Sequence, residues 1–240
     1  MVVRINLLDK YPLTIRDQDM QYVPDARHSE RGYFWFVTHK PNDVTRQAAC
    51  LERIITGLPQ LGTAVEFFGG IGMCSIMIHE ILQPTRHLIY DIDPFCARHL
   101  KHLTRNWKGV EVRQGNVFDA PLSKFEQAQF FSFDFNQFTI MDLNGRLAVI
   151  DKLSAVITSV RPRYVQITDS AVNKLHLNLE RYGSIAGMKM TNIQDYIQGF
   201  SGLAYRRWKY SATRAYYHFG ASYILLEPGR HRLKELEKIK

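Results

Sequence analysis

Two carboxylates and a run of glycines carry the strongest chemical signal in the chain. The segment Glu66-Phe67-Phe68-Gly69-Gly70-Ile71-Gly72 places an acidic residue before the glycines, and Asp91 follows 19 positions after Gly72. Glycines adopt positive φ and let a ligand approach the backbone closely, and a helix that begins after them offers free N–H groups. A carboxylate about 20 positions further on is typical of one that binds ribose hydroxyls. The pattern predicts a site for a nucleotide-like molecule.

The glycine pattern lacks its third member, because Met73, Cys74 and Ser75 follow Gly72. This departure from G-x-G-x-x-G weakens a nicotinamide or flavin assignment, and a nucleotide-dependent oxidoreductase stays an alternative. The plainer alternative is a tight turn between a strand and a helix, which glycines also serve. The carboxylates on both sides of the turn favour the binding site.

Strand and helix patterns alternate through most of the chain and place these residues at strand ends. Buried strands are expected at 64–68, 87–91, 110–113, 129–133 and 164–168, and helices at 42–55, 72–82, 94–106, 146–160, 172–182 and from 191. Such alternation predicts an α/β fold with a mostly parallel sheet and helices on both faces. Two further strands, at 205–210 and 221–227, stand too close for a crossover helix. They are therefore expected to form a C-terminal antiparallel hairpin that completes a seven-stranded, Rossmann-like sheet.

The length of 240 residues suits one domain with additions. We expect an N-terminal extension at 1–41 with a short aromatic strand at 32–38, the main domain at 42–228, and a charged C-terminal tail at 229–240. No apolar run approaches the length that spans a bilayer, and the first residues do not resemble a secretory signal. The three cysteines form no CxxC pair, so no metal site is readable. We expect a cytoplasmic protein without membrane contact or metal.

The order of motifs over about 42–227 resembles the class I S-adenosylmethionine-dependent methyltransferases. The glycine segment is similar to the DxFxGxG form of DNA methyltransferases, 90–94 resembles the second motif, and 114–118 resembles the third. In this family the second-motif acid holds the ribose and the next residue packs on the adenine. Asn116 stands where the family usually has Asp, and an amide oxygen can accept the same hydrogen bond. The resemblance implies that the cofactor contacts Glu66, Phe67, Phe68, Gly69, Gly70, Gly72, Asp91, Ile92, Asn116, Val117 and Asp134.

The fourth motif bears on the reaction. Amino-group DNA methyltransferases carry [DNS]PP[YFW] there, whereas this chain has Asp134-Phe135-Asn136-Gln137-Phe138 without the prolines. The resemblance implies that Asp134 and Asn136 are catalytic and that Phe138 stacks on the target base. The alternatives are a helix cap for Asp134 and turn chemistry for Asn136. No cysteine lies in the motif, which argues against methylation of cytosine at ring carbon five.

Positive charge favours a nucleic acid partner, DNA or RNA. The formal net charge is +8, and such a field attracts polyanions. Basic residues alternate with aromatic ones near the C-terminus, a composition that suits phosphate contact and base stacking. We expect phosphate contacts from Arg206, Arg207, Lys209 and Arg214. An amphipathic edge hairpin is the alternative explanation of the same residues.

Together these patterns predict a methyltransferase that uses S-adenosylmethionine and acts on a nucleic acid at a base nitrogen. Methylation of a protein or a small molecule is the first alternative, and the loss of the fourth-motif prolines favours it. A non-catalytic binding module with this fold is the second, and the retained acidic and glycine residues argue against it. The sequence leaves the oligomeric state open.

Overall fold

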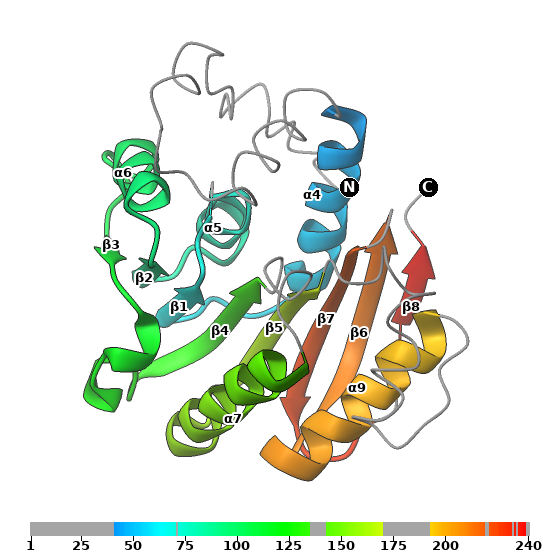
Figure 1. Cartoon of the computed structure of the whole chain (residues 1–240). Helices are drawn as coiled ribbons and strands as arrows, with labels where there is room; N and C mark the ends of the chain where they lie inside the picture. The colour runs from blue at the N-terminus through cyan, green and yellow to red at the C-terminus, as the bar shows by residue number, and fades with distance from the viewer. Residues whose placement is uncertain are drawn as a thin grey trace.

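One sheet of eight strands runs through the part of the chain that the structure describes, with helices on both of its faces (Figure 1). The structure is a computed structural model and describes residues 41–70, 72–134, 143–169, 193–218, 221–231, 233 and 235–238. The expected strand at 32–38, the expected helix at 172–182, Asn136 and Phe138 lie outside these residues.

The strands are β1 (Thr63–Phe67), β2 (Arg86–Asp91), β3 (Val110–Gln114), β4 (Ala128–Asp134), β5 (Tyr164–Asp169), β6 (Tyr210–His218), β7 (Ala221–Pro228) and β8 (Glu235–Lys238). The α-helices are α4 (Pro41–Ile55), α5 (Met73–Met77), α6 (Pro94–Leu103), α7 (Leu143–Val160) and α9 (Ile193–Trp208). A π-helical turn, η1 (Ile78–Leu82), continues α5, and two 3₁₀ turns, η2 (Val117–Asp119) and η3 (Leu122–Lys124), precede β4.

The strand order is β3-β2-β1-β4-β5-β7-β6-β8. The pairs from β3 to β5 are parallel, whereas β7 runs antiparallel to both β5 and β6. This arrangement confirms the mostly parallel sheet and the antiparallel C-terminal hairpin. The eighth strand, β8, pairs parallel with β6. It lies in the segment that the sequence analysis assigned to a charged tail, and Glu237 there pairs with Arg53 of α4 at 2.6 Å.

The strand expected at 205–210 is wrong in its position. Helix α9 continues to Trp208, and the strand runs instead from Tyr210 to His218. The cause is a buried stripe at helical spacing, formed by Tyr196, Ile197, Leu203, Ala204 and Trp208. The indole N–H of Trp208 also donates to Ser154 Oγ of α7, so that this last turn is held against α7.

Apolar residues fill both faces of the sheet because most strands are buried on both sides. All five residues of β1 are buried, as the continuous apolar run predicted. One face packs against α7 and α9 and holds the rings of Phe67, Phe125, Phe131 and Phe133. The other face packs against α4, α5 and η1. No helix in the described part of the chain is long and apolar enough to cross a membrane.

The parallel strands all end on the same edge of the sheet, which we call the carboxyl edge. Cross-strand partners place Phe67 beside Phe133, Asp91 beside Gln114, and Asp134 beside Thr168. The loops that follow β1, β2 and β3 therefore meet there, beside the last residue of β4. In such sheets ligands bind outside the carboxyl ends of the strands.

We predict that Phe131→Ala lowers the free energy of unfolding by about 3–5 kcal/mol, since it removes a fully buried ring. The Phe131 ring packs edge-on against Phe67 and Phe133 at centroid distances of 5.2 and 5.9 Å. The half-buried Phe118 of the same core serves as the control, and Phe118→Ala should cost less than half as much. Urea unfolding of both variants measures this, and equal losses would contradict the assigned core.

Candidate functional site

The loop after β1 uses its glycines for two different purposes. A Cβ on Gly69 would lie 2.6 Å from Ile89 Cγ2, and one on Gly72 would lie 2.5 Å from Leu103 Cδ2. These two glycines let the loop pack tightly against β2 and α6. Gly70 has φ +54, and a Cβ there would meet none of the residues that the structure describes within 4 Å. Among those residues Gly70 therefore faces open space, where a ligand can approach the backbone.

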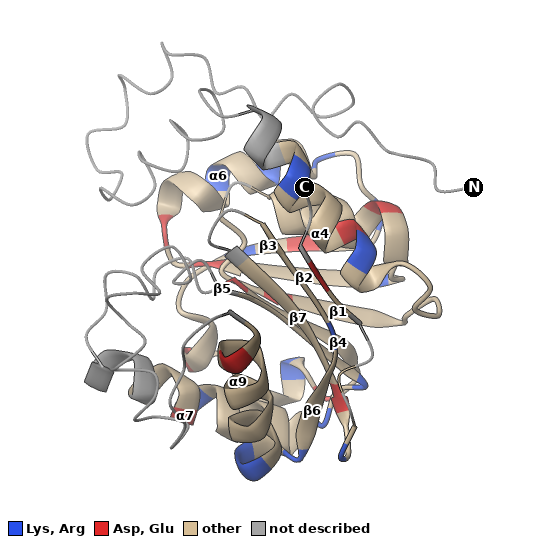
Figure 2. Cartoon of the chain, turned by 90° about the vertical axis from the view of Figure 1, so that its right-hand side faces the viewer, with Lys and Arg blue, Asp and Glu red and all other residues tan. Residues whose placement is uncertain are grey.

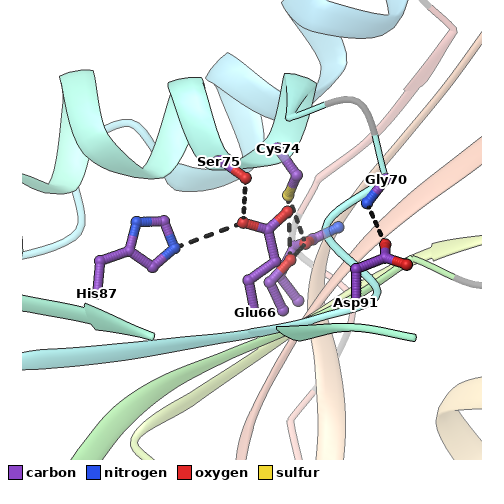
Figure 3. A network of polar contacts seen from close by, with 8 residues as sticks. Glu66, Gly70, Cys74, Ser75, His87 and Asp91 are labelled. Carbon is purple, nitrogen blue, oxygen red and sulfur yellow. Dashed lines mark hydrogen bonds and ion pairs between the residues drawn. The ribbon is translucent and has the colours of Figure 1, made fainter. Parts of the chain in front are cut away.

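Asp91, the last residue of β2, points at this loop (Figure 3). Its Oδ2 accepts a hydrogen bond from the Gly70 N–H at 2.7 Å, and its Oδ1 accepts one from the Asp93 N–H at 2.8 Å. Burial raises the pKa of Asp91 above its ordinary value, and the two backbone hydrogen bonds oppose that rise. Each carboxylate oxygen retains capacity for a further donor, such as a hydroxyl group.

A second glycine faces open space beside Asp91. The Gly115 N–H donates to the Asp91 carbonyl at 2.8 Å, and a Cβ on Gly115 would meet nothing within 4 Å. The next residue, Asn116, uses its Oδ1 to accept from the Phe118 N–H at 3.2 Å and so caps η2. Its amide nitrogen and the second lone pair of its oxygen remain able to contact a ligand.

The other residues expected around the cofactor divide between surface and core. Ile92 is 43% exposed and stands next to Asp91, whereas Phe67 and Val117 are buried in the core that faces α7 and α9. Phe68 is half-buried, has φ +67, and packs edge-on against Phe118 at 6.1 Å. Of these four side chains, Ile92 and Phe68 are the ones with surface exposed to a ligand, and the cofactor contacts expected of Phe67 and Val117 stay predictions.

Glu66 lies beneath α5 rather than beside the open space at Gly70. It is fully buried, its Oε2 accepts from Ser75 Oγ at 2.6 Å, and the same oxygen is 3.4 Å from His87 Nε2 (Figure 3). Glu66 Oε1 has no hydrogen-bond partner in the structure. The side chain thus links β1, β2 and α5 directly below the glycine loop. Its predicted contact with a cofactor stays a prediction.

A row of buried polar groups continues from Glu66 across the sheet, and the sequence analysis missed it. Ser132 of β4 lies beside Glu66 and donates to Gln166 Oε1 of β5 at 2.5 Å. The Gln166 amide donates to Thr168 Oγ1 at 2.7 Å, and Cys74 Sγ contacts Ser132 Oγ at 3.0 Å. Burial raises the pKa of Cys74 well above its ordinary value, so the thiol is neutral. The available signal was the presence of polar residues inside otherwise apolar strands.

Asp134, the predicted catalytic carboxylate, is the last residue of β4 and is half-buried at the carboxyl edge. Its neighbour across the sheet is Thr168, the end of the buried polar row. The structure therefore places Asp134 on the same edge as Gly70 and Asp91. The other two fourth-motif predictions, Asn136 and Phe138, lie outside the described residues.

Helix α6 begins at this site with a residue that the sequence analysis left without a role. Asp93 is the N-cap, and its Oδ1 accepts from the Phe95 and Cys96 N–H groups at 2.7 and 3.0 Å. Proline follows it at the first helical position, where its missing N–H costs nothing. The cap fixes the direction in which the chain leaves Asp91. An Asp-Pro pair was the signal for it.

The four cations expected to hold phosphates do not gather at the carboxyl edge. Tyr210 pairs with Pro228 at the opposite edge of the sheet, and Arg206, Arg207 and Lys209 immediately precede it. Arg207 forms an ion pair with Asp151 of α7. Arg214 lies within β6 and donates to the carbonyls of Ile54 and Thr56 at 3.3 and 2.8 Å, so it caps the end of α4. The structure thus separates these cations from Gly70 and Asp91.

No group of three metal-ligating side chains that could hold an ion occurs among the residues that the structure describes. The chemistry available at the carboxyl edge is hydrogen bonding by Asp91, backbone contact at Gly70 and Gly115, and a carboxylate at Asp134. These groups suit a molecule with hydroxyls and a flat ring system more than one with several phosphates.

Solved structures with the same fold are methyltransferases. Trm1 from Pyrococcus horikoshii in complex with S-adenosyl-L-methionine has a TM-score of 0.57 at 10% identity over 79% of this chain and 56% of that one. The small RNA methyltransferase HEN1 has a TM-score of 0.56 at 11% identity over 81% of this chain and 26% of that one. Mitomycin 7-O-methyltransferase MmcR has a TM-score of 0.53 at 10% identity over 85% of this chain and 59% of that one.

This chain spans less than two thirds of the length of each of these three proteins. No protein-family model and no curated protein matches the sequence. At 10–11% identity the likeness concerns the fold. The strand order, the antiparallel β7 and these neighbours together show that the chain has the class I, Rossmann-like fold of S-adenosylmethionine-dependent methyltransferases.

Proposed function

We propose that the chain transfers a methyl group from S-adenosylmethionine to a nitrogen of a nucleic acid base. The observation that carries the cofactor assignment is the hydrogen bond between Asp91 and Gly70, beside open space at both Gly70 and Gly115. Asp91 would accept hydrogen bonds from the ribose hydroxyls, and Ile92 would pack on the adenine. Trm1, which has the same fold, is known in complex with this cofactor.

The residues of the chain would act by orientation and by proton acceptance. S-adenosylmethionine supplies a methyl group on a positively charged sulfur, and the base nitrogen displaces that sulfur in line. The new bond forms between nitrogen and methyl carbon, the sulfur keeps the electrons of the broken bond, and the nitrogen proton must leave. Asp134, at the same edge of the sheet as Asp91, would orient the amine and accept that proton, directly or through water.

The nucleic acid assignment rests on charge and on the fourth motif. The net charge of +8 favours a polyanionic substrate, and Asp134-Phe135-Asn136-Gln137-Phe138 keeps a polar group and an aromatic ring of the amino-base motif. HEN1, which shares the fold, is a small RNA methyltransferase. MmcR shares the fold as well and is a mitomycin methyltransferase. A small-molecule acceptor is therefore the second candidate.

We expect labelled methyl groups from S-adenosylmethionine to appear on RNA or DNA when a panel of RNA, DNA, protein and small aromatic acceptors is offered. In Asp134→Ala the rate should fall by roughly 10²–10⁴, the usual contribution of a positioned general base. Transfer by the variant at the parental rate would remove Asp134 from the mechanism, and label on the small acceptors alone would select the second candidate.

A side chain at Gly70 should block the cofactor. Gly70→Leu adds atoms in the open space beside Asp91, and we expect the affinity for S-adenosylmethionine to fall by more than roughly tenfold, equivalent to about 1.4 kcal/mol. Gly57 is the matched control, since it has φ +79 and also faces open space, in the turn after α4. Both substitutions carry a similar left-handed backbone cost of about 1–2 kcal/mol. Calorimetric titration that shows equal affinities for the two variants would refute this site.

The pKa of Asp91 predicts how cofactor affinity depends on pH. Burial raises this pKa, and hydroxyl donors from a ribose would favour the charged carboxylate and lower it. By linkage, affinity should therefore fall as the pH is lowered from neutral through the raised pKa, and level off above it. In Asp91→Asn that pH dependence should vanish together with most of the affinity. An unchanged pH profile in the variant would show that Asp91 does not contact the ligand.

A further inference from the structure

Three loops that are far apart in the sequence meet at the edge of the sheet opposite the carboxyl edge. They comprise residues 161–163 between α7 and β5, residues 206–209 at the end of α9, and residues 229–231 after β7. The Tyr210 hydroxyl donates to the Pro162 carbonyl, and the Gly229 N–H donates to the Lys209 carbonyl at 2.7 Å. These contacts hold the three loops side by side.

Lys and Arg residues concentrate on these loops, as the lower part of Figure 2 shows. We call them the basic loop surface, which consists of Arg161, Arg163, Arg206, Arg207, Lys209 and Arg230. All six are exposed. Arg206, Arg207 and Lys209 were expected from the sequence to contact phosphate. The fold brings Arg161, Arg163 and Arg230 beside them from other segments of the chain.

Aromatic rings order several of these cations. Arg163 lies over the Tyr164 ring at 5.3 Å, and Lys209 and Arg230 both lie over the Tyr205 ring, at 5.6 and 6.0 Å. Such contacts hold a cation in place without neutralising its charge. Positively charged groups that are ordered yet still charged are suited to binding phosphates.

Nearby carboxylates and helix ends neutralise only part of the positive charge of the basic loop surface. Among the described residues nearby, Asp151 pairs with Arg207, and Glu227 accepts a hydrogen bond from Thr213 at 2.7 Å. The C-termini of α7 and α9 also lie here, and each carries a partial charge of roughly −0.5 that cations stabilise. With Arg206 left out of the count, about two positive charges remain after both carboxylates and both helix ends are subtracted.

We propose that the basic loop surface binds the phosphodiester backbone of a nucleic acid at a distance from the site of methyl transfer. The proposal rests on the proposed function in taking a nucleic acid as the substrate. Strands of five to seven residues separate this surface from the carboxyl edge, which corresponds to about 20 Å at 3.3 Å per residue. Asp91 on β2 also lies three to five strand positions from β5, β7 and β6, so the two sites are about 25–31 Å apart at about 4.8 Å per strand. A substrate longer than about nine base pairs can therefore span them, at 3.4 Å per base pair.

The composition of the surface favours a nucleic acid over an acidic protein. Protein interfaces bury an apolar core, and the exposed large hydrophobic residues in the described part of the chain are Ile92, after β2, and Leu122, in η3. Arg and Lys beside tyrosine rings, without exposed aliphatic side chains, match phosphate contact. The surface holds long substrates and does not touch the reacting base.

The test compares two triple variants of the full chain that each remove three positive charges. Arg163→Ala, Lys209→Ala and Arg230→Ala alter the basic loop surface, whereas Arg98→Ala, Lys101→Ala and Lys108→Ala alter exposed cations on and after α6. Fluorescence anisotropy with a labelled 30-nucleotide RNA and a 30-base-pair DNA measures affinity over a series of salt concentrations. We expect the first variant to lower the slope of log K against log salt by about two to three and the second to lower it by less.

Several results would overturn the proposal. One is that the first variant binds nucleic acid with the parental affinity. Another is that the α6 variant loses as much affinity as the first. The third is that polyglutamate at equal charge concentration displaces the nucleic acid. The last result would assign the surface to an acidic polypeptide. Calorimetry with S-adenosylmethionine separates a failure of this proposal from a failure of the proposed function. It measures cofactor binding at the carboxyl edge and does not depend on the basic loop surface. We expect the first variant to bind the cofactor like the parent and to methylate a five-nucleotide fragment at the parental rate.

Discussion

The hydrogen bond from the Gly70 N–H to the Asp91 carboxylate is the contact on which the carboxyl edge depends. It joins the loop after β1 to the end of β2 at 2.7 Å. The loop can reach Asp91 only because Gly69 and Gly72 lack side chains, since Ile89 and Leu103 occupy the space that a Cβ would need. Packing thus brings the backbone and the carboxylate together, and the open space at Gly70 results from that packing.

Burial gives this contact its chemical character. A carboxylate with little access to water has a raised pKa, and the two N–H donors from Gly70 and Asp93 keep it in place. Below the loop, Glu66 is buried more deeply, accepts a hydrogen bond from Ser75 and lies 3.4 Å from His87 Nε2 instead of facing the open space. Two acidic residues of similar appearance in the sequence therefore have different surroundings. One supports the loop from beneath, and the other is available to a ligand.

Much of the fold was predictable because buried parallel strands and amphipathic helices leave strong local patterns. The segments around Val65, Ile89 and Phe131 are apolar runs of strand length bounded by turn residues, and the structure confirms all three. The strand expected at 205–210 failed because an alternation over six residues imitated a strand, while the helical stripe from Tyr196 to Trp208 decided the outcome. Helical packing against α7 is a tertiary effect, which that short segment could not reveal.

Site residues were predictable where the chemistry lies in one segment and were missed where it depends on neighbours in space. Gly70 and Asp91 were found because their spacing reflects one strand, one turn and one helix. The row of Ser132, Gln166 and Thr168 comes from two strands, β4 and β5, and only the register of those strands shows that Ser132 touches Gln166. For the same reason, Arg207 and Lys209 were predicted to bind phosphate, but their position opposite the carboxyl edge required the strand order.

The central claim is that Asp91 binds the sugar of an adenosyl ligand beside Gly70. A crystal structure of the full chain grown with S-adenosylhomocysteine, the product of methyl transfer, tests it most directly. The account predicts that both ribose hydroxyl oxygens lie about 2.5–3.0 Å from Asp91 Oδ atoms, the range of O–H···O bonds to carboxylates, with the adenine against Ile92. An adenosyl group bound elsewhere, or a ribose that does not contact Asp91, would contradict the account.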